Sequence, residues 1–216
     1  MRNLLKSILL SLFILSCSST KDYRYFDENN VEISKSKFNR IRLTNKLLDI
    51  PGDSINHKKL TLREKRGTLT NMPKFIETLK VGLNITLDAT KPIAIIFYPG
   101  EDSCNSGGTG KKEWVKNWNK QLEDGLHQVA KIKPLYIYKD SKGLENYDGL
   151  LDWKQDPNQF IVQLFFKHHY PCSSFVVISS KGDYISYFGE FPKEFVWEAV
   201  QILKQTISSY QSHNSP

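Results

Sequence analysis

The sequence predicts a mixed α/β fold in which helices cover both faces of a central sheet. Residues 93–98 (IAIIFY) form an apolar run that ends at a Pro-Gly pair, which is typical of a strand covered on both faces. Apolar residues then recur at helical spacing over 115–129, and 135–138 (LYIY) is the next strand. A strand, a helix and a strand in this order predict parallel strands joined by a right-handed crossover.

The chain before this unit predicts a small arm. Residues 23–33 (YRYFDENNVEI) alternate around a polar centre, which indicates a hairpin or an extended arm with a turn. A helix is expected next, with Phe38 on its inner face and Ser34 or Ser36 as its N-cap. Residues 58–70 (KKLTLREKRGTLT) are basic. We interpret them as a solvated strand or loop face, with contact to lipid headgroups or glycans as the alternative.

The elements between the arm and the last hairpin follow from their patterns. Residues 73–83 predict a helix, whereas 141–155 are polar and resemble a loop. Asp156 and Pro157 suit the N-cap and first position of a helix. That helix must end before Pro171, because the residue preceding a proline disfavours helical backbone.

The C-terminal part predicts a hairpin followed by a helix. Two apolar stretches, 174–179 and 183–188, flank a Lys-Gly turn and predict antiparallel strands. Pro192 opens the last helix. The residues expected on its core face are Val196, Val200, Leu203 and Ile207.

Composition and charge narrow the class of protein. The chain has 216 residues, of which 39% are hydrophobic and 25% charged, enough to bury an ordinary core and too apolar for a wholly disordered chain. The net charge is +7. Two of the cations, Arg2 and Lys6, lie in an export segment, which leaves +5 for the remainder. So modest an excess does not indicate a nucleic-acid partner.

The first 16 residues predict an export signal. A short basic segment precedes the apolar run 8–15 (ILLSLFIL), which is too short to span a membrane. The end of this run together with the next two residues, Ile14-Leu15-Ser16-Cys17, resembles the lipobox of bacterial lipoproteins. The resemblance implies cleavage before Cys17, lipidation of its thiol and attachment to a membrane of the bacterial cell envelope. An ordinary signal peptide with a chance cysteine is the alternative.

This division assigns residues 1–16 to the signal peptide, 17–70 to a lipid-anchored tether and arm, and 71–212 to the folded domain. The lipid anchor makes the membrane a partner, and an envelope protein is a candidate second partner. Without Cys17, two cysteines remain in an oxidising compartment, where they tend to pair if geometry allows.

The folded domain resembles the thioredoxin family over roughly residues 72–210. Cys104 follows the first central strand, where this family keeps its redox cysteine, and Pro171 precedes a later strand, where it keeps a cis-proline. Residues 188–194 (FGEFPKE) are similar to the family's glycine bulge and the start of its last helix. The arrangement is most similar to membrane-tethered thioredoxin-like and peroxiredoxin-like lipoproteins. It implies a thioredoxin-like mixed central sheet with helices on both faces, plus the N-terminal arm.

The chain lacks the redox motif of the thioredoxin family. Thioredoxins use Cys-x-x-Cys at a helix start, whereas this chain has Cys104-Asn105-Ser106-Gly107 and lacks the second cysteine. Gly107 and the glycines after it disfavour a helix directly behind Cys104. The neighbouring carboxylates of Glu101 and Asp102 disfavour a thiolate.

The resemblance implies a partner for Cys104 elsewhere in the chain. In this fold the proline loop packs on the redox cysteine, so Cys172, next to Pro171, should approach Cys104. We therefore predict a Cys104–Cys172 disulfide, which stabilises by roughly 3–4 kcal/mol on the loop-entropy model. It could be a permanent crosslink or a reversible catalytic pair, and two independent thiols are the third alternative. His168 and His169 could act as proton donor or acceptor in thiol–disulfide exchange. Alternatively, they are simply histidines at a helix C-terminus, where the helix dipole favours them.

Other motifs in the sequence do not indicate a functional site. The stretch 105–112 departs from a phosphate-binding loop at both of its ends. Neither a His-Glu-x-x-His nor a Cys/His zinc pattern occurs, so we predict no metal and no cofactor. We interpret Trp114, Trp118 and Trp153 as core or rim aromatics rather than as a ligand platform.

Two functions remain. The first is a non-catalytic binding or scaffold module crosslinked by Cys104–Cys172, which the missing Cys-x-x-Cys motif favours. The second is a thiol–disulfide oxidoreductase or peroxidase that uses Cys104, with Cys172 as the resolving cysteine and Pro171, His168 and His169 in support.

Overall fold

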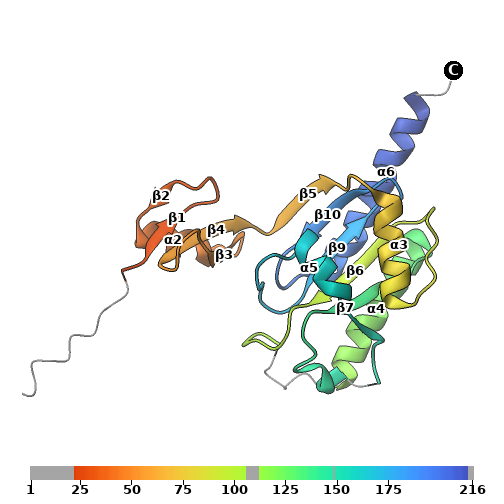
Figure 1. The fold of residues 1–216 in the computed structure, drawn as a ribbon, viewed down its shortest axis with the longest axis horizontal. Helices are drawn as coiled ribbons and strands as arrows, with labels where there is room; N and C mark the ends of the chain where they lie inside the picture. The colour runs from red at the N-terminus through yellow and green to blue at the C-terminus, as the bar shows by residue number, and fades with distance from the viewer. Residues whose placement is uncertain (1–21, 106–111, 148, 214–216) are drawn as a thin grey trace, which may run out of the picture.

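The computed structural model describes residues 22–105, 112–147 and 149–213. The predicted signal peptide, Cys17, Gly107, Gly108 and Gly110 lie outside this part, as does the side chain of Ile207. The described residues form two mixed sheets and five α-helices (Figure 1), which confirms the mixed α/β class. None of these helices is both long and apolar enough to cross a membrane.

The smaller sheet builds the N-terminal arm, residues 22–62, with strand order β2-β1-β4-β3. β1 is antiparallel to β2, which confirms the predicted hairpin, and parallel to β4. The Ser34 hydroxyl accepts a hydrogen bond from the Lys37 amide (3.2 Å) and caps α2 as predicted. The arm consists of β1 (Arg24–Phe26), β2 (Glu32–Ile33), α2 (Lys35–Leu43), β3 (Leu47–Pro51) and β4 (His57–Leu62).

The larger sheet has six strands in the order β5-β10-β9-β6-β7-β8. β6 and β7 run parallel, as the predicted crossover requires. β8 is also parallel to β7, and the other neighbours pair antiparallel. β5, which belongs to the basic stretch of the sequence, is an edge strand of this sheet. The strands are β5 (Glu64–Thr68), β6 (Ile93–Tyr98), β7 (Leu135–Tyr138), β8 (Trp153–Gln155), β9 (Ser174–Ile178) and β10 (Asp183–Tyr187).

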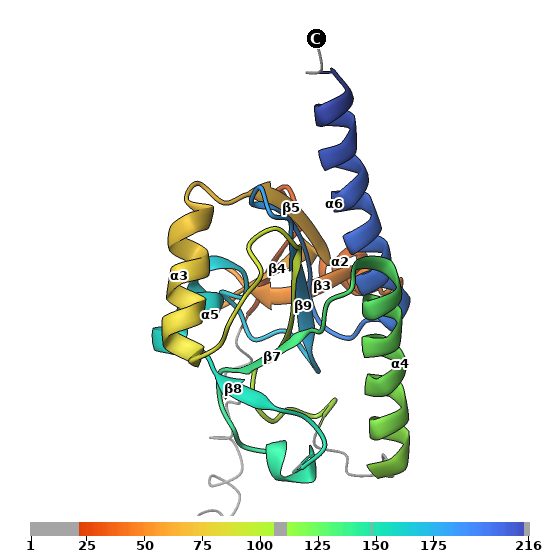
Figure 2. The ribbon, with the colours of Figure 1, turned by 90° about the vertical axis from the view of Figure 1, so that its right-hand side faces the viewer.

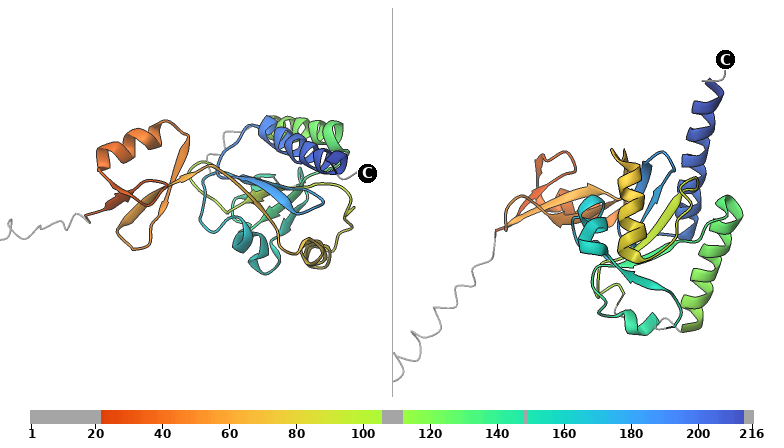
Figure 3. Two further views of the ribbon diagram at one scale, coloured as in Figure 1. Left: turned by 90° about the horizontal axis from the view of Figure 1, so that it is seen from above. Right: turned by 45° about the vertical axis from the view of Figure 1, so that its right-hand side comes forward.

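Helices cover both faces of the larger sheet (Figures 2 and 3). α3 (Met72–Leu83) and α5 (Phe160–Leu164) share one apolar core with alternate residues of β6, among them Ile95. α4 (Lys112–Ala130) and α6 (Lys193–His213) form the second core with the intervening residues, among them Ile96. Successive strand residues point to opposite faces, so the wholly buried run 93–98 serves both cores.

The stretch 141–155 is more ordered than predicted. It contains the 3₁₀ turn η1 (Leu144–Tyr147) and strand β8, which pairs with β7. The loop prediction was therefore wrong for the last three of these residues. β8 is too short to show an alternating pattern, and what places it is the free backbone edge of β7.

The helix predicted after Asp156 is present but short. η2 (Pro157–Gln159) comes first, and Asn158 and Gln159 have left-handed backbone (φ 52° and 57°), which separates it from α5. The buried Asp156 carboxylate accepts hydrogen bonds from two amides of α5, Ile161 and Val162, both at 2.9 Å. Asp156 thus caps a helix that begins four residues later.

Arg63 corrects the expectation of a solvated basic face over residues 58–70. Its side chain is buried between the arm and the larger domain, with 8% of the residue exposed. The guanidinium donates to the backbone carbonyl (2.9 Å) and side-chain oxygen (2.5 Å) of Asn45, and to the carbonyls of Phe188 and Glu190 (both 3.3 Å). A run of basic residues in the sequence does not show which of their side chains will be buried and hydrogen-bonded in the fold.

Candidate functional site: a disulfide beside an aromatic pocket

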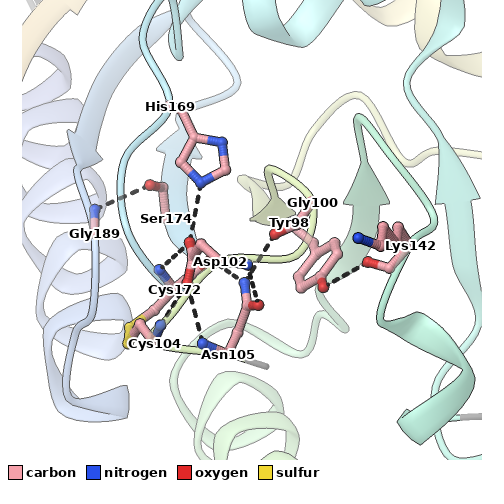
Figure 4. A network of polar contacts seen from close by, with 10 residues as sticks. All are labelled: Tyr98, Gly100, Asp102, Cys104, Asn105, Lys142, His169, Cys172, Ser174 and Gly189. Carbon is pink, nitrogen blue, oxygen red and sulfur yellow. Dashed lines mark hydrogen bonds and ion pairs between the residues drawn. A yellow bond between two sulfur atoms is a disulfide. The ribbon is translucent and has the colours of Figure 1, made fainter. Parts of the chain in front are cut away.

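The two cysteines of the described chain meet at one edge of the larger sheet. β6 and β9 are antiparallel neighbours with Phe97 opposite Ser174, so the segment after β6 and the segment before β9 emerge together. Cys104 and Cys172 form a disulfide across these segments, with their Cα atoms 5.1 Å apart and a separation of 68 positions in sequence. The predicted pairing is confirmed, and Cys104 lies on the exposed side of it (Figure 4).

Asp102 organises both cysteine loops (Figure 4). Its Oδ1 accepts from the amides of Cys104 (2.8 Å) and Asn105 (3.1 Å). Its Oδ2 accepts from the amide of Cys172 (2.9 Å) and lies 3.0 Å from Nε2 of His169. The carboxylate is 14% exposed and therefore ties the two loops together independently of the sulfurs.

Asn105 adds a second tie between the loops. Its side-chain oxygen accepts from the Asp102 amide (2.8 Å), and its Nδ2 donates to the carbonyls of Gly100 (2.9 Å) and Cys172 (3.3 Å). With the two loops already held together, two reduced thiols would stay close to each other. A high effective concentration of thiols favours the disulfide over its reduced form.

Pro171 and the two histidines only partly follow the prediction. No peptide bond among the described residues is cis, so the cis-proline implied at Pro171 is wrong. The chain turns instead at Cys172, which has left-handed backbone (φ 65°) and thereby presents its amide to Asp102. His169 joins the Asp102 network, whereas His168 packs edge-on against Tyr170, and burial lowers the pKa of its imidazole.

An apolar pocket of about 230 Å³ opens beside the disulfide. Both half-cystines border it, and α4, β8 and the segment after β10 provide most of the rest. Trp118 and Trp153 pack on the core and Trp114 stands 63% exposed at the rim, as expected. All three also line the pocket, which the interpretation against a ligand platform did not anticipate. The aromatic residues around the pocket are Tyr98, Trp114, Trp118, Tyr147, Trp153 and Phe191.

Polar side chains also line the pocket, among them Asn119, Ser173 and Glu190. The Tyr98 hydroxyl donates to the Lys142 carbonyl (2.8 Å), and burial raises the pKa of its phenol. The buried Nε1 of Trp153 has no hydrogen-bond partner within the described residues. Glu190 brings a carboxylate oxygen within 4.8 Å of both sulfurs, but sulfurs joined in a disulfide are not thiolate ligands for a metal ion.

Sequence reasoning missed the residues that hold this site together. From the sequence, Asp102 is interpreted only as a negative charge near the Cys104 thiol. Asn105 is noted only as a mismatch to the phosphate-binding loop. The spacing Asp-x-Cys-Asn does suit a carboxylate that accepts from amides two and three residues later. No protein-family model matches the chain, and no curated protein matches it.

Proposed function

We propose that this protein is a lipoprotein of the bacterial cell envelope, anchored through Cys17, whose thioredoxin-like domain is a non-catalytic binding module. Its ligand is an apolar or aromatic group of an envelope protein. The order β6, α4, β7, α5, β9–β10, α6 supports the thioredoxin-like part, because it repeats the order implied by the resemblance. The lipobox-like segment before Cys17 supports the anchor.

One observation carries the binding role: an aromatic-lined pocket lies beside a crosslink that fixes its wall. Binding sites for small apolar groups are concave and mostly apolar, with few polar groups. Aromatic side chains supply large contact areas at low cost in conformational entropy. The disulfide and the Asp102 network keep the Cys104 and Cys172 loops in place, so the pocket is formed before a ligand arrives.

The same geometry argues against exchange chemistry. An exchanging thiol needs a stabilised thiolate, commonly at a helix N-terminus. α4 begins at Lys112, eight residues after Cys104, and the nearest described charge to both cysteine amides is the Asp102 carboxylate. A negative charge disfavours the thiolate.

One observation favours the alternative, a thiol–disulfide oxidoreductase or peroxidase: Cys104 is exposed at the pocket mouth, where a substrate thiolate could reach its sulfur. Exchange would form a mixed disulfide at Cys104 and release the thiolate of Cys172, which later resolves it. Insulin reduction and peroxide consumption by wild type and Cys104→Ser separate the two functions. Equal, negligible rates are expected, and a rate that depends on Cys104 would establish the enzyme.

Binding itself can be tested with N-acetyl-tryptophanamide as a minimal aromatic ligand. We expect its titration to shift the NMR signals of Trp118 and Trp153 in the wild type. Trp114→Ala should weaken binding several-fold, because it removes an aromatic ring from the pocket rim. The fold should stay intact, because that ring is mostly exposed. Val81→Ala is the matched control, since Val81 is 72% exposed on α3, outside the pocket. Chemical-shift changes of similar size for residues all over the protein surface would contradict binding in a specific pocket.

A further inference from the structure

The excess positive charge of the chain is confined to one region. Residues 17–70 contain 12 Lys and Arg against 7 Asp and Glu, whereas residues 71–216 contain 16 of each. The whole +5 that follows the export segment therefore lies in the part of the chain next to Cys17. Residues 17–70 therefore attract anionic surfaces more strongly than residues 71–216, whose net charge is zero.

Helix α2 carries the clearest part of this charge. Lys35, Lys37, Arg40 and Arg42 are all exposed, the helix contains no acidic residue, and its inner side is occupied by the buried Phe38. Within the part of the chain that the structure describes, none of these four cations takes part in an ion pair. By contrast, Arg24 on β1 is paired with Glu32.

The edge of the arm where the chain arrives from Cys17 also carries one almost fully exposed apolar side chain. The Asn56 side chain donates to the Asp22 carbonyl (3.3 Å), and the Arg24 amide donates to the Asn56 carbonyl (2.9 Å). The neighbouring Ile55 is 90% exposed. Lys35, at the start of α2, lines a shallow hollow together with Asp22, so α2 begins at this same edge.

The length of the tether limits how far this edge can lie from the lipid. From Cys17 to Asp22 there are five residue steps, which span at most about 18 Å when fully extended. The larger domain projects from the other end of the arm (Figure 1). An acyl chain on Cys17 would thus hold unpaired cations and an exposed isoleucine against a membrane surface.

We propose that the arm docks on the anionic phospholipid surface of the membrane that holds the anchor, with the first α2 cations, Lys35 and Lys37, nearest the headgroups and Ile55 in the interface. This rests on the lipid anchor of the proposed function. Basic segments are attracted to anionic lipid within a Debye length, and apolar side chains add affinity by burial in the interface. The docked arm would fix the orientation of the domain and its pocket above the membrane.

The test uses the purified full-length lipoprotein, reconstituted in vesicles of phosphatidylcholine alone or with phosphatidylglycerol. An environment-sensitive fluorophore is attached through Ile55→Cys or, as the matched control, through Val81→Cys on the domain. We expect a blue shift and several-fold stronger quenching by lipid-borne quenchers at position 55 only. The shift should need the anionic lipid and should weaken in 1 M salt.

A charge variant completes the test. Replacing the four α2 cations by Gln should abolish the shift at position 55, whereas replacing Lys74, Lys80, Lys116 and Lys120 of the domain by Gln should leave it. Equal emission at positions 55 and 81 in an acylated protein would overturn docking and leave the anchor standing. A shift that depends on protein concentration without vesicles would instead mean that a second copy covers the arm. A mass spectrum with unmodified Cys17 would overturn the anchor and docking together.

Discussion

The arm and the domain of this protein are stabilised in different ways. The domain encloses two apolar cores around a six-stranded sheet and is further crosslinked by Cys104–Cys172. The arm has a four-stranded sheet, yet the only hydrophobic residues it fully buries among those described are Phe38, Leu48 and Leu60. So small a core does not usually hold a unit of this size folded.

The arm therefore depends on the domain. Leu48 of β3 belongs to one of the domain's own cores, and Arg63 joins Asn45 of the arm to the carbonyls of Phe188 and Glu190. The Phe188 amide returns a hydrogen bond to the Arg63 carbonyl (2.7 Å). A small element can thus keep an exposed, charged surface for other uses when a buried cation, a backbone hydrogen bond and apolar side chains of β3 attach it to the domain.

The largest expected effect tests the crosslink of the domain. Replacing Cys104 and Cys172 by Ser should lower the free energy of unfolding by roughly 3–4 kcal/mol, because the open chain gains loop entropy when unfolded. Denaturant titrations of the oxidised wild type and the double variant measure it. A loss below about 1 kcal/mol would mean that the Asp102 and Asn105 ties make the disulfide redundant.

Removal of the Arg63 head group tests how the arm is attached. Arg63→Met keeps the aliphatic stem but leaves the carbonyls of Phe188 and Glu190 without this donor, at a cost of about 2–3 kcal/mol. Hydrogen exchange should show the arm amides losing protection before those of β6. Arg66→Met is the control, since its exposed pair with Glu64 contributes under about 0.5 kcal/mol. Uniform loss of protection would show instead that the arm and domain unfold as one unit.

A smaller effect is expected at Asp102, within the domain. Asp102→Asn keeps one acceptor but turns an amide group toward the N–H donors, so we expect a loss of about 1–2 kcal/mol. Amide exchange at Cys104 and Cys172 should accelerate together, because one carboxylate serves both. Faster exchange at Cys104 alone would argue that the Cys172 loop is held by the disulfide and Asn105.

The smallest effect concerns pH. Burial, and secondarily Lys167, lower the pKa of His168 in the folded state, so the unfolded chain binds more protons. This contribution makes stability fall as pH drops from 7 through the unfolded value of about 6.5. His168→Gln should flatten the dependence of the melting temperature on pH between 7 and 5.5. Parallel curves for wild type and His168→Gln would remove His168 as a source of pH dependence.

The candidate site was predictable where it depends on strand order and not where it depends on loop detail. The Cys104–Cys172 pairing follows once the two loops are placed at one sheet edge, which the resemblance implied. The loop residues themselves were not predictable. A left-handed Cys172 and a shared Asp102 carboxylate arise from contacts between segments about 70 positions apart, which leave no local periodicity.

The two-sided strand 93–98, the amphipathic helices and a serine N-cap at Ser34 or Ser36 could be read from the sequence, because burial pattern and capping are local properties of the chain. The tertiary structure alone decided that Arg63, among several adjacent cations, is internal, that a short polar segment becomes β8, and that three tryptophans share one pocket with a disulfide. Those outcomes depend on which backbone carbonyls, strand edges and ring faces are left unsatisfied after the cores have packed.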